Sequence, residues 1–313
     1  MPDLMKLFFT DEVMRRLRNA PQTMSLQWRR LVLTASGPAP PDPFEADLIL
    51  RARAQRAAWE VYIDSAHAVG LLDAPHDRDL VQRLTSVDDD QFRSAIAECL
   101  AAWYFRGKLG LPTSARPTGA RNRPLELLVK LPEGDMHVEV KSPLVEPICD
   151  GVARSFDDSG LLEERLAKAA SQFGQDTMNL LFLTGRLTLP IMDHRRFLSK
   201  AFYADQRMVI PISKRTGEPT EPMRVEYTAD GRFLKHWGDE GPRHTRVSGV
   251  MFVEEHIRDI PTIGRESRRM AFHDALVMHN PNATYPLPED VWGDCPQFVR
   301  RGDELLWTDG HQV

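Results

Sequence analysis

The sequence predicts a mixed α/β fold, and two changes of pattern along the chain support this prediction. The first third has helical patterns throughout, and residues 45–68 are rich in Ala, Arg, Leu and Glu, which indicates helices without strands. From Gly110 onward, short apolar runs bounded by turn residues appear, and these are typical of strands. We therefore expect a helical N-terminal subdomain over residues 1–90 and an α/β domain over residues 91–313.

The helical subdomain is expected to contain several separate helices. Residues 1–36 have a helical pattern, and Thr10 is a candidate N-cap because its side chain can accept a hydrogen bond from the first turn. Residues 34–44 hold four prolines and must interrupt the helix, since proline lacks the N–H that a helix interior requires. Further helices are predicted over residues 45–68, 77–85 and 89–109.

The α/β domain begins with two apolar runs that are expected to form a β-hairpin. These runs are residues 125–131 and 136–142, joined by the turn residues 132–135. We also expect a helix over 160–173, a strand over 179–184 and a buried strand over 247–253. An inserted segment over 187–246 separates the two strands. It is expected to contain a helix near 193–204, a strand near 208–212 and a hairpin that turns at 229–231. The last 50 residues hold four spaced prolines, so loops are predicted there.

Composition and charge exclude several classes of protein. A hydrophobic fraction of 42% and a charged fraction of 27% are ordinary for a folded soluble domain and unlike those of disordered, collagen-like or membrane-spanning chains. The net charge of -5 excludes a uniformly basic protein that coats nucleic acid, although a local basic groove remains compatible. The three cysteines are far apart and the N-terminal apolar run is short, so we expect a cytoplasmic protein without a signal peptide.

The predicted hairpin places carboxylates and a lysine together. Glu139 and Lys141 lie on one face of the second strand, whereas Val140 lies on the other. Glu126 lies on the first strand, and a tight hairpin brings its carboxylate toward Glu139. Two carboxylates, the carbonyl of Val140 and waters suit Mg²⁺, which prefers oxygen ligands. Lys141 would then orient an attacking water or stabilise charge on a phosphate.

Glu98 is a further candidate ligand. On the predicted helix 89–109 it is the only charged residue in a small apolar stripe. The other residues of this stripe are Ala95, Ala102, Phe105 and Leu109. A lone carboxylate in such a stripe requires a partner, and a metal ion would supply one. The plainer alternatives are a surface charge for Glu98 and a solvent-facing pair on an edge strand for Glu139 and Lys141.

The order of these elements resembles the PD-(D/E)xK nuclease superfamily, which has the restriction-endonuclease-like fold. The resemblance covers about residues 92–185: a helix with Glu98, strands with Pro124-Leu125-Glu126 and Glu139-Val140-Lys141, then a helix whose polar face holds Lys168 and Gln172. It implies a three-layer α/β/α core with a mixed sheet. It also implies Mg²⁺ bound by Glu98, Glu126 and Glu139, with Mn²⁺ as a substitute, a catalytic Lys141 and an accessory Gln172.

This chain departs from the family pattern at one position. The acid of the family usually follows the proline directly and is Asp, whereas here Leu125 intervenes and the acid is Glu126. A regular strand would then turn Glu126 to the other face, so the register must shift for this side chain to join the site. For Lys168 and Gln172, the plainer alternative is a solvated helix face.

The resemblance implies Mg²⁺-dependent hydrolysis of phosphodiester bonds, with DNA favoured over RNA. Arg116, Arg121 and Arg123 form a basic approach to the site and, with Lys168, are candidates for substrate binding. Other basic residues, including Arg195, Arg207, Lys214, Arg215 and Arg269, either line a nucleic-acid groove or are ordinary surface residues. The alternative is a catalytically inactive nuclease-like module that binds nucleic acid or a protein partner; the sequence leaves a homo-oligomer open and predicts no membrane association.

Overall fold

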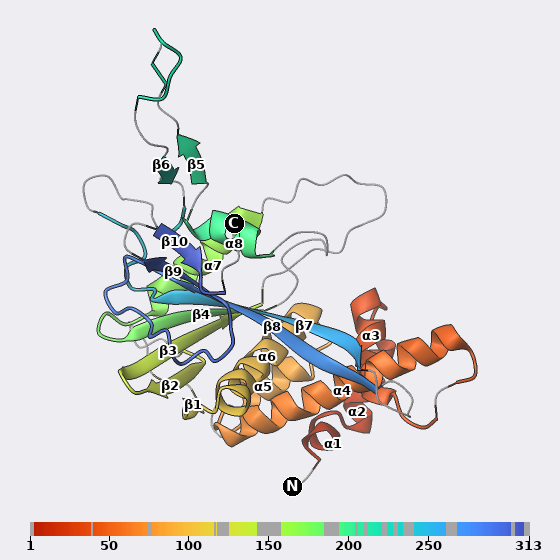
Figure 1. Cartoon of the computed structure of the whole chain (residues 1–313). Coiled ribbons are helices and arrows are strands. Elements are labelled where there is room, and N and C mark those ends of the chain that lie inside the picture. The colour runs from red at the N-terminus through yellow and green to blue at the C-terminus, as the bar shows by residue number, and fades with distance from the viewer. Residues whose placement is uncertain are drawn as a thin grey trace.

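The N-terminal third of the chain is helical in the computed structural model, and the rest forms one large sheet with helices on both faces (Figure 1). The structure describes residues 3–38, 40–73, 77–115, 117, 125–142, 158–184, 194–203, 206–209, 212–213, 215–220, 224–227, 231–233, 241–260, 268–301 and 304–309. The helices are α1 (Leu4–Phe8), α2 (Asp11–Asn19), α3 (Met24–Thr34), α4 (Pro43–Ala68), α5 (Asp77–Leu84), α6 (Asp89–Ala102), α7 (Asp158–Gln172) and α8 (His194–Tyr203), with a π-helical turn, η1 (Trp103–Lys108), directly after α6.

The main sheet mixes parallel and antiparallel strands. Its order is β1-β2-β3-β4-β7-β8-β9-β10, with β3–β4, β4–β7 and β8–β9 parallel and the other pairs antiparallel. The strands are β1 (Thr113–Ala115), β2 (Leu127–Leu131), β3 (Gly134–Lys141), β4 (Met178–Thr184), β7 (Gly249–Ile260), β8 (Arg268–His279), β9 (Gln297–Arg301) and β10 (Glu304–Trp307). A separate two-stranded sheet consists of β5 (Gln206–Val209) and β6 (Arg224–Tyr227).

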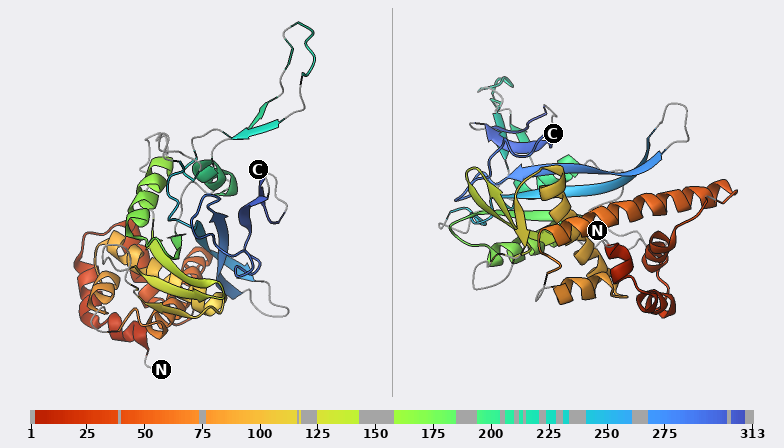
Figure 2. Two further views of the ribbon diagram at one scale, coloured as in Figure 1. Left: turned by 90° about the vertical axis from the view of Figure 1, so that its left-hand side faces the viewer. Right: turned by 90° about the horizontal axis from the view of Figure 1, so that it is seen from below.

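The two faces of the sheet belong to different hydrophobic cores. Val138 and Val140 of β3 pack with α1–α6 in the first core. Leu181 and Leu183 of β4 pack with α7 and α8 in the second. Alternation along each strand produces this division, because successive side chains point to opposite faces. Figures 1 and 2 show the same layers, with the N-terminal helices on one side of the sheet and α7 and α8 on the other.

Many of the predicted elements are present close to their expected boundaries. Thr10 is the N-cap of α2, where its hydroxyl accepts a hydrogen bond from the N–H of Val13. The predicted 125–142 hairpin is β2–β3, the predicted helix 160–173 is α7, and the predicted strand 179–184 is β4. Glycine at position 134 suits the hairpin, because its φ of 140° is unfavourable for other residues.

The prediction of loops in the last 50 residues is confirmed for residues 280–296, which contain the four prolines, and is wrong for the strands on either side. Strands β8, β9 and β10 extend the main sheet there, and the four prolines lie between β8 and β9 instead of interrupting them. In the inserted segment, α8 and β5 are present, but β6 pairs back onto β5. Residues 229–230 of the predicted hairpin turn lie outside the described residues. None of the described helices is long and apolar enough to cross a membrane.

Candidate metal and phosphoryl-transfer site

The β2–β3 hairpin brings two of the predicted carboxylates together. The antiparallel register pairs Leu127 with Val138, and one further step places Glu126 opposite Glu139. Leu125 packs in the second core, whereas Leu127 packs in the first, so the chain is not a regular strand over residues 125–127. Alternation back from Leu127 therefore places Glu126 on the face of Glu139, and the irregularity lies at Leu125, which would otherwise share the face of Leu127.

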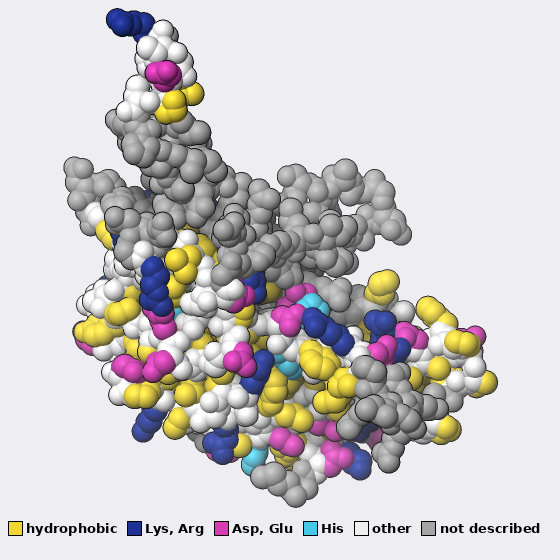
Figure 3. All heavy atoms as spheres, in the orientation of Figure 1, with side chains coloured by type: hydrophobic (Ala, Val, Ile, Leu, Met, Phe, Trp, Pro, Cys, Tyr) yellow, Lys and Arg dark blue, Asp and Glu magenta, His cyan; other side chains and the backbone are white. Residues whose placement is uncertain are grey.

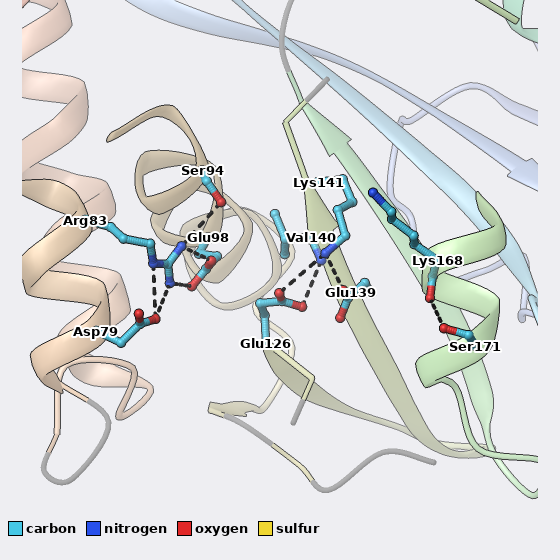
Figure 4. Close-up of polar contacts among 10 residues, drawn as sticks. All are labelled: Asp79, Arg83, Ser94, Glu98, Glu126, Glu139, Val140, Lys141, Lys168 and Ser171. Carbon is cyan, nitrogen blue, oxygen red and sulfur yellow. Dashed lines mark hydrogen bonds and ion pairs between the residues drawn. The ribbon is translucent and has the colours of Figure 1, made fainter. Parts of the chain in front are cut away.

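Lys141 forms ion pairs with both carboxylates. Its ammonium group is hydrogen-bonded to Oε1 of Glu139 and lies 3.9 Å from Oε1 of Glu126. Oε2 of Glu126 accepts a hydrogen bond of 3.1 Å from the backbone N–H of Val140. These contacts join the ends of β2 and β3 into one polar cluster, defined by Glu126, Glu139 and Lys141 and shown in Figure 4.

The environment of this cluster is strongly shielded from solvent. The Glu139 side chain is 0% exposed, and those of Glu126 and Lys141 are 19% and 21% exposed. The burial of Glu139 excludes the solvent-facing pair considered as the plain alternative. Two carboxylates and one ammonium carry an excess negative charge when all are ionised, and such a charge is costly away from water.

Burial and the neighbouring carboxylate raise the pKa of Glu126. Burial is the larger cause, and Glu139 adds to it, while Lys141 and the N–H of Val140 act in the opposite direction. Oε2 of Glu139 is buried and has no hydrogen-bond partner among the described residues. The cluster therefore has an unsatisfied acceptor, together with surplus negative charge when both carboxylates are ionised, and a bound cation would relieve both.

Glu98 is buried as expected, but its carboxylate is bound by an arginine. The residue is 4% exposed, which excludes a surface charge. The guanidinium of Arg83 donates to both of its oxygens, at 2.6 and 3.0 Å, in a bidentate pair. Arg83 also contacts Asp79 and Ser94 (Figure 4).

The alternation of β3 explains why Glu98 and the cluster are separate. Helix α6 packs in the first core, on the face of Val138 and Val140. Glu139 and Lys141 belong to the opposite face, as do their parallel partners Leu181 and Leu183 on β4. Among the described residues, no three His, Cys, Asp or Glu side chains are grouped closely enough to hold a metal together.

The helix α7 holds the other two predicted site residues. Lys168 is exposed and pairs with Glu164 one turn earlier, and its carbonyl accepts a hydrogen bond from the hydroxyl of Ser171. This agrees with the plainer alternative of a solvated helix face. Gln172 is the last residue of α7 and is half-buried. Arg116, Arg121 and Arg123 lie outside the described residues.

The residues of the cluster fit a magnesium ion. Mg²⁺ is commonly held by one or two carboxylates and completes its coordination with waters and substrate phosphates. Glu126 and Glu139 provide that number of carboxylates, and the unsatisfied Oε2 of Glu139 is a suitable ligand atom. The fit rests on these two side chains. The predicted contribution of the Val140 carbonyl remains a prediction.

Arg83 was not among the predicted site residues. Its guanidinium binds the buried carboxylate of Glu98 and also contacts Asp79 and Ser94. Arg83 is therefore a partner for Glu98. A signal was present, because Arg83 lies on a predicted helix, four residues after an aspartate. A basic residue one helix away therefore satisfies the buried carboxylate for which a metal ion was predicted.

Comparison with known proteins identifies no relative: no family model, curated protein or solved structure matches this chain.

Proposed function

We propose that this protein is a Mg²⁺-dependent nuclease with a restriction-endonuclease-like core, acting on DNA in preference to RNA. The observation that supports this most directly is the cluster itself. Glu126 and Glu139 face each other across a hairpin, Lys141 pairs with both, and an oxygen of Glu139 is buried without a partner. The mixed sheet with helices on both faces is compatible with such a core.

In this proposal each residue of the cluster has a distinct role. Glu126 and Glu139 would hold Mg²⁺, which when bound supplies charge neutralisation at the phosphate and a lower pKa for a nearby water. On substrate binding, Lys141 would exchange its carboxylate contacts for the attacking water or a phosphate oxygen. A positive charge held there stabilises the additional negative charge that the phosphate acquires in the transition state. The N–H of Val140 keeps the Glu126 carboxylate in place.

A second candidate function is a catalytically inactive nuclease-like module that binds nucleic acid or a protein partner. The bidentate pair between Arg83 and Glu98 favours it, because that pair occupies a carboxylate that the family resemblance assigns to the metal. This candidate predicts binding that does not depend on metal and that persists in Glu139→Ala.

The decisive experiment measures hydrolysis of labelled DNA and RNA by the purified protein with Mg²⁺ or Mn²⁺. We expect cleavage of DNA by the native chain and a loss of at least about a hundredfold in Lys141→Ala, because general acid–base or charge stabilisation typically contributes that much. The matched control is Lys130→Ala, which removes an exposed lysine of the same hairpin and should leave the rate unchanged.

Metal binding provides a readout that is independent of activity. Glu139→Gln keeps the size of the side chain but removes its charge, so it should weaken Mn²⁺ binding in calorimetry by at least about tenfold. A native protein that binds neither ion and cuts neither nucleic acid, with Lys141→Ala indistinguishable from it, would falsify the proposal. Metal-independent binding without cleavage would support the second candidate.

A further inference from the structure

A two-stranded arm projects from the body of the molecule. It consists of β5, β6 and the residues between them, of which 212–213 and 215–220 are described, and its tip is the turn between Ser213 and Glu218. Its strands pair with each other and not with the main sheet. Figure 1 and the left view of Figure 2 show it extending alone into solvent. A strand of about ten residues spans roughly 30 Å, so such an arm can contact a partner well away from the core.

The base of the arm is fixed to the body. Helix α8 ends at Tyr203 just before β5, and Phe233 follows the arm on the return. The N–H of Phe233 donates to the carbonyl of Phe202 at 2.8 Å, and their rings stack with centroids 5.1 Å apart. Both rings are buried in the second core. The arm is therefore an insertion with a closed base, so shortening it should leave the core intact.

The arm and the polar cluster of Glu126, Glu139 and Lys141 lie on the same side of the main sheet. The arm leaves from α8, which packs in the second core with α7. Glu139 and Lys141 belong to the face of β3 that shares this side, in register with Leu181 and Leu183. One extended ligand lying over the α7–α8 side could therefore contact both.

The outgoing limb and the tip of the arm are basic. Residues 206–217 contain Arg207, Lys214 and Arg215 and no acidic residue, although the whole chain has a net charge of -5. The return limb holds Glu218, Glu221 and Glu226 together with Arg224, so the four basic and three acidic residues of 206–227 give the arm a net charge of +1, and Glu226 is the cross-strand partner of Arg207. At the tip, the N–H of Gly217 donates to the carbonyl of Ser213 at 2.8 Å, and Arg215 is exposed in that turn. A basic side chain is visible at the outermost end of the arm in Figure 3.

We propose that the arm binds duplex nucleic acid by placing its tip in the major groove, next to the segment presented to the cluster. A major groove about 12 Å wide accommodates a two-stranded ribbon, and Arg215 would meet the phosphates that border it. An isolated two-stranded hairpin is only marginally stable in water, so the arm gains order when a partner covers it. This inference rests on the proposed function, because it takes its ligand from the substrate class of that site.

The test is the affinity of the full chain for a labelled 30-base-pair duplex, measured by fluorescence anisotropy in EDTA at several salt concentrations. We expect Arg215→Glu to weaken binding by about fivefold or more and to reduce the salt slope by about one. The matched control is Arg51→Glu, which changes an arginine of similar surface character on α4, on the opposite side of the sheet. A second variant replaces residues 207–226 with a four-residue Gly-Ser link and should lose at least about tenfold in affinity.

Circular dichroism and thermal unfolding establish that the shortened chain is folded. Equal duplex affinity of the native, Arg215→Glu and shortened proteins would overturn the inference. So would an arm-dependent dimer in light scattering with unchanged duplex affinity, because the arm would then bind a second copy of the chain. Failure of the proposed function is distinguishable, because it is measured as absence of metal-dependent cleavage by the native protein, whereas the contribution of the arm is measured as duplex affinity in EDTA.

Discussion

Arg83 and Glu98 form a buried ion pair whose two members come from different helices. Arg83 lies on α5 and Glu98 on α6, and the carboxylate is almost fully buried beside Cys99 in the first core. Removal of the cation would take the bidentate partner away from a carboxylate that is 4% exposed in a largely apolar environment. We expect Arg83→Met to lower the free energy of unfolding by about 3–5 kcal/mol, measured by denaturant titration.

Two further variants distinguish charge imbalance from lost packing. The double variant Arg83→Met, Glu98→Met should recover much of the loss, because neither charge remains buried alone. Arg51→Met disrupts an exposed pair with Asp47 and should change stability by less than about 1 kcal/mol. If Arg83→Met is as stable as Arg51→Met, the Arg83–Glu98 pair does not contribute to the free energy of unfolding.

His279 predicts a dependence of stability on pH. Burial lowers its pKa below the usual 6.5, and the hydrogen bond with Gln297 offsets this only partly. Below about pH 6.5, the unfolded chain binds a proton at this position that the folded chain does not. The free energy of unfolding should therefore fall as the pH falls through this range, by at most about 1.4 kcal/mol per pH unit.

The measurement compares native protein, His279→Gln and His67→Gln in denaturant titrations between pH 5 and pH 8. His279→Gln should have a smaller pH dependence than the native chain, whereas His67→Gln, which changes an exposed histidine, should retain it. Parallel curves for all three proteins would contradict this assignment.

At the scale of elements, β7 and β8 extend beyond the sheet as a ribbon that rests on α4. The ribbon comprises residues 254–260 and 268–274, past the last β7 residue that pairs with β4. Glu255 accepts hydrogen bonds from Gln55 and Tyr62 of α4, and His273 contacts both Tyr62 and Glu255. Burial alone would raise the pKa of Glu255, but the hydrogen bonds from His273, Tyr62 and Gln55 outweigh burial and lower it.

The hydroxyl of Tyr62 is therefore expected to hold the ribbon against α4. Tyr62→Phe retains the ring, which is packed against Trp103, and removes only the hydrogen bonds. We expect a loss of about 1–2 kcal/mol in stability and faster amide hydrogen exchange in residues 268–274. As a control, exchange in β3 and β4 should not change. Faster exchange throughout the sheet would indicate global destabilisation instead.

The elements differ in how well local sequence predicts them. The β2–β3 hairpin and α7 were predictable, because their apolar residues alternate or recur at helical spacing next to clear turn residues. Strand β8 was not, because half of it lies in the ribbon, where the polar residues Arg269 and His273 contact α4 while the apolar Met270 and Phe272 are exposed. Strand patterns are recognisable only where one face is buried.

The candidate site was also predictable only where local sequence determines the structure. Glu126, Glu139 and Lys141 could be grouped because one hairpin determines their placement. The partner of Glu98 could not, since the Arg83–Glu98 contact depends on how α5 packs on α6 and not on strand register. The local pattern thus predicted the polar cluster, whereas the partner of Glu98 depends on tertiary packing.

At the scale of the whole molecule, the N-terminal helices and the sheet share one core. Val32, Ile63 and Leu84 are fully buried in the same cluster as Val138 and Phe182. The predicted boundary between residues 1–90 and 91–313 therefore crosses a continuous apolar interior. Each fully buried aliphatic side chain contributes about 1.5–3 kcal/mol, so many such contacts would be lost together.

We expect the fragment 91–313 to lack a cooperative unfolding transition, in contrast to the full chain. Calorimetry checks this, and binding of a hydrophobic dye reports the exposed first core. Co-expression with residues 1–90 as a separate chain should restore the transition if the loss comes from missing packing. A sharp transition in the fragment alone would show that the two parts fold independently.

The π-helical turn after α6 also affects how lengths can vary in this fold. In η1 the N–H of Leu109 donates to the carbonyl of Tyr104 at 2.9 Å, five residues back instead of four. A chain with one residue fewer here could close the same turn as ordinary α-helix. A single-residue deletion between Trp103 and Leu109 is therefore expected to convert this turn into α-helix and to preserve the pairing of β1 with β2.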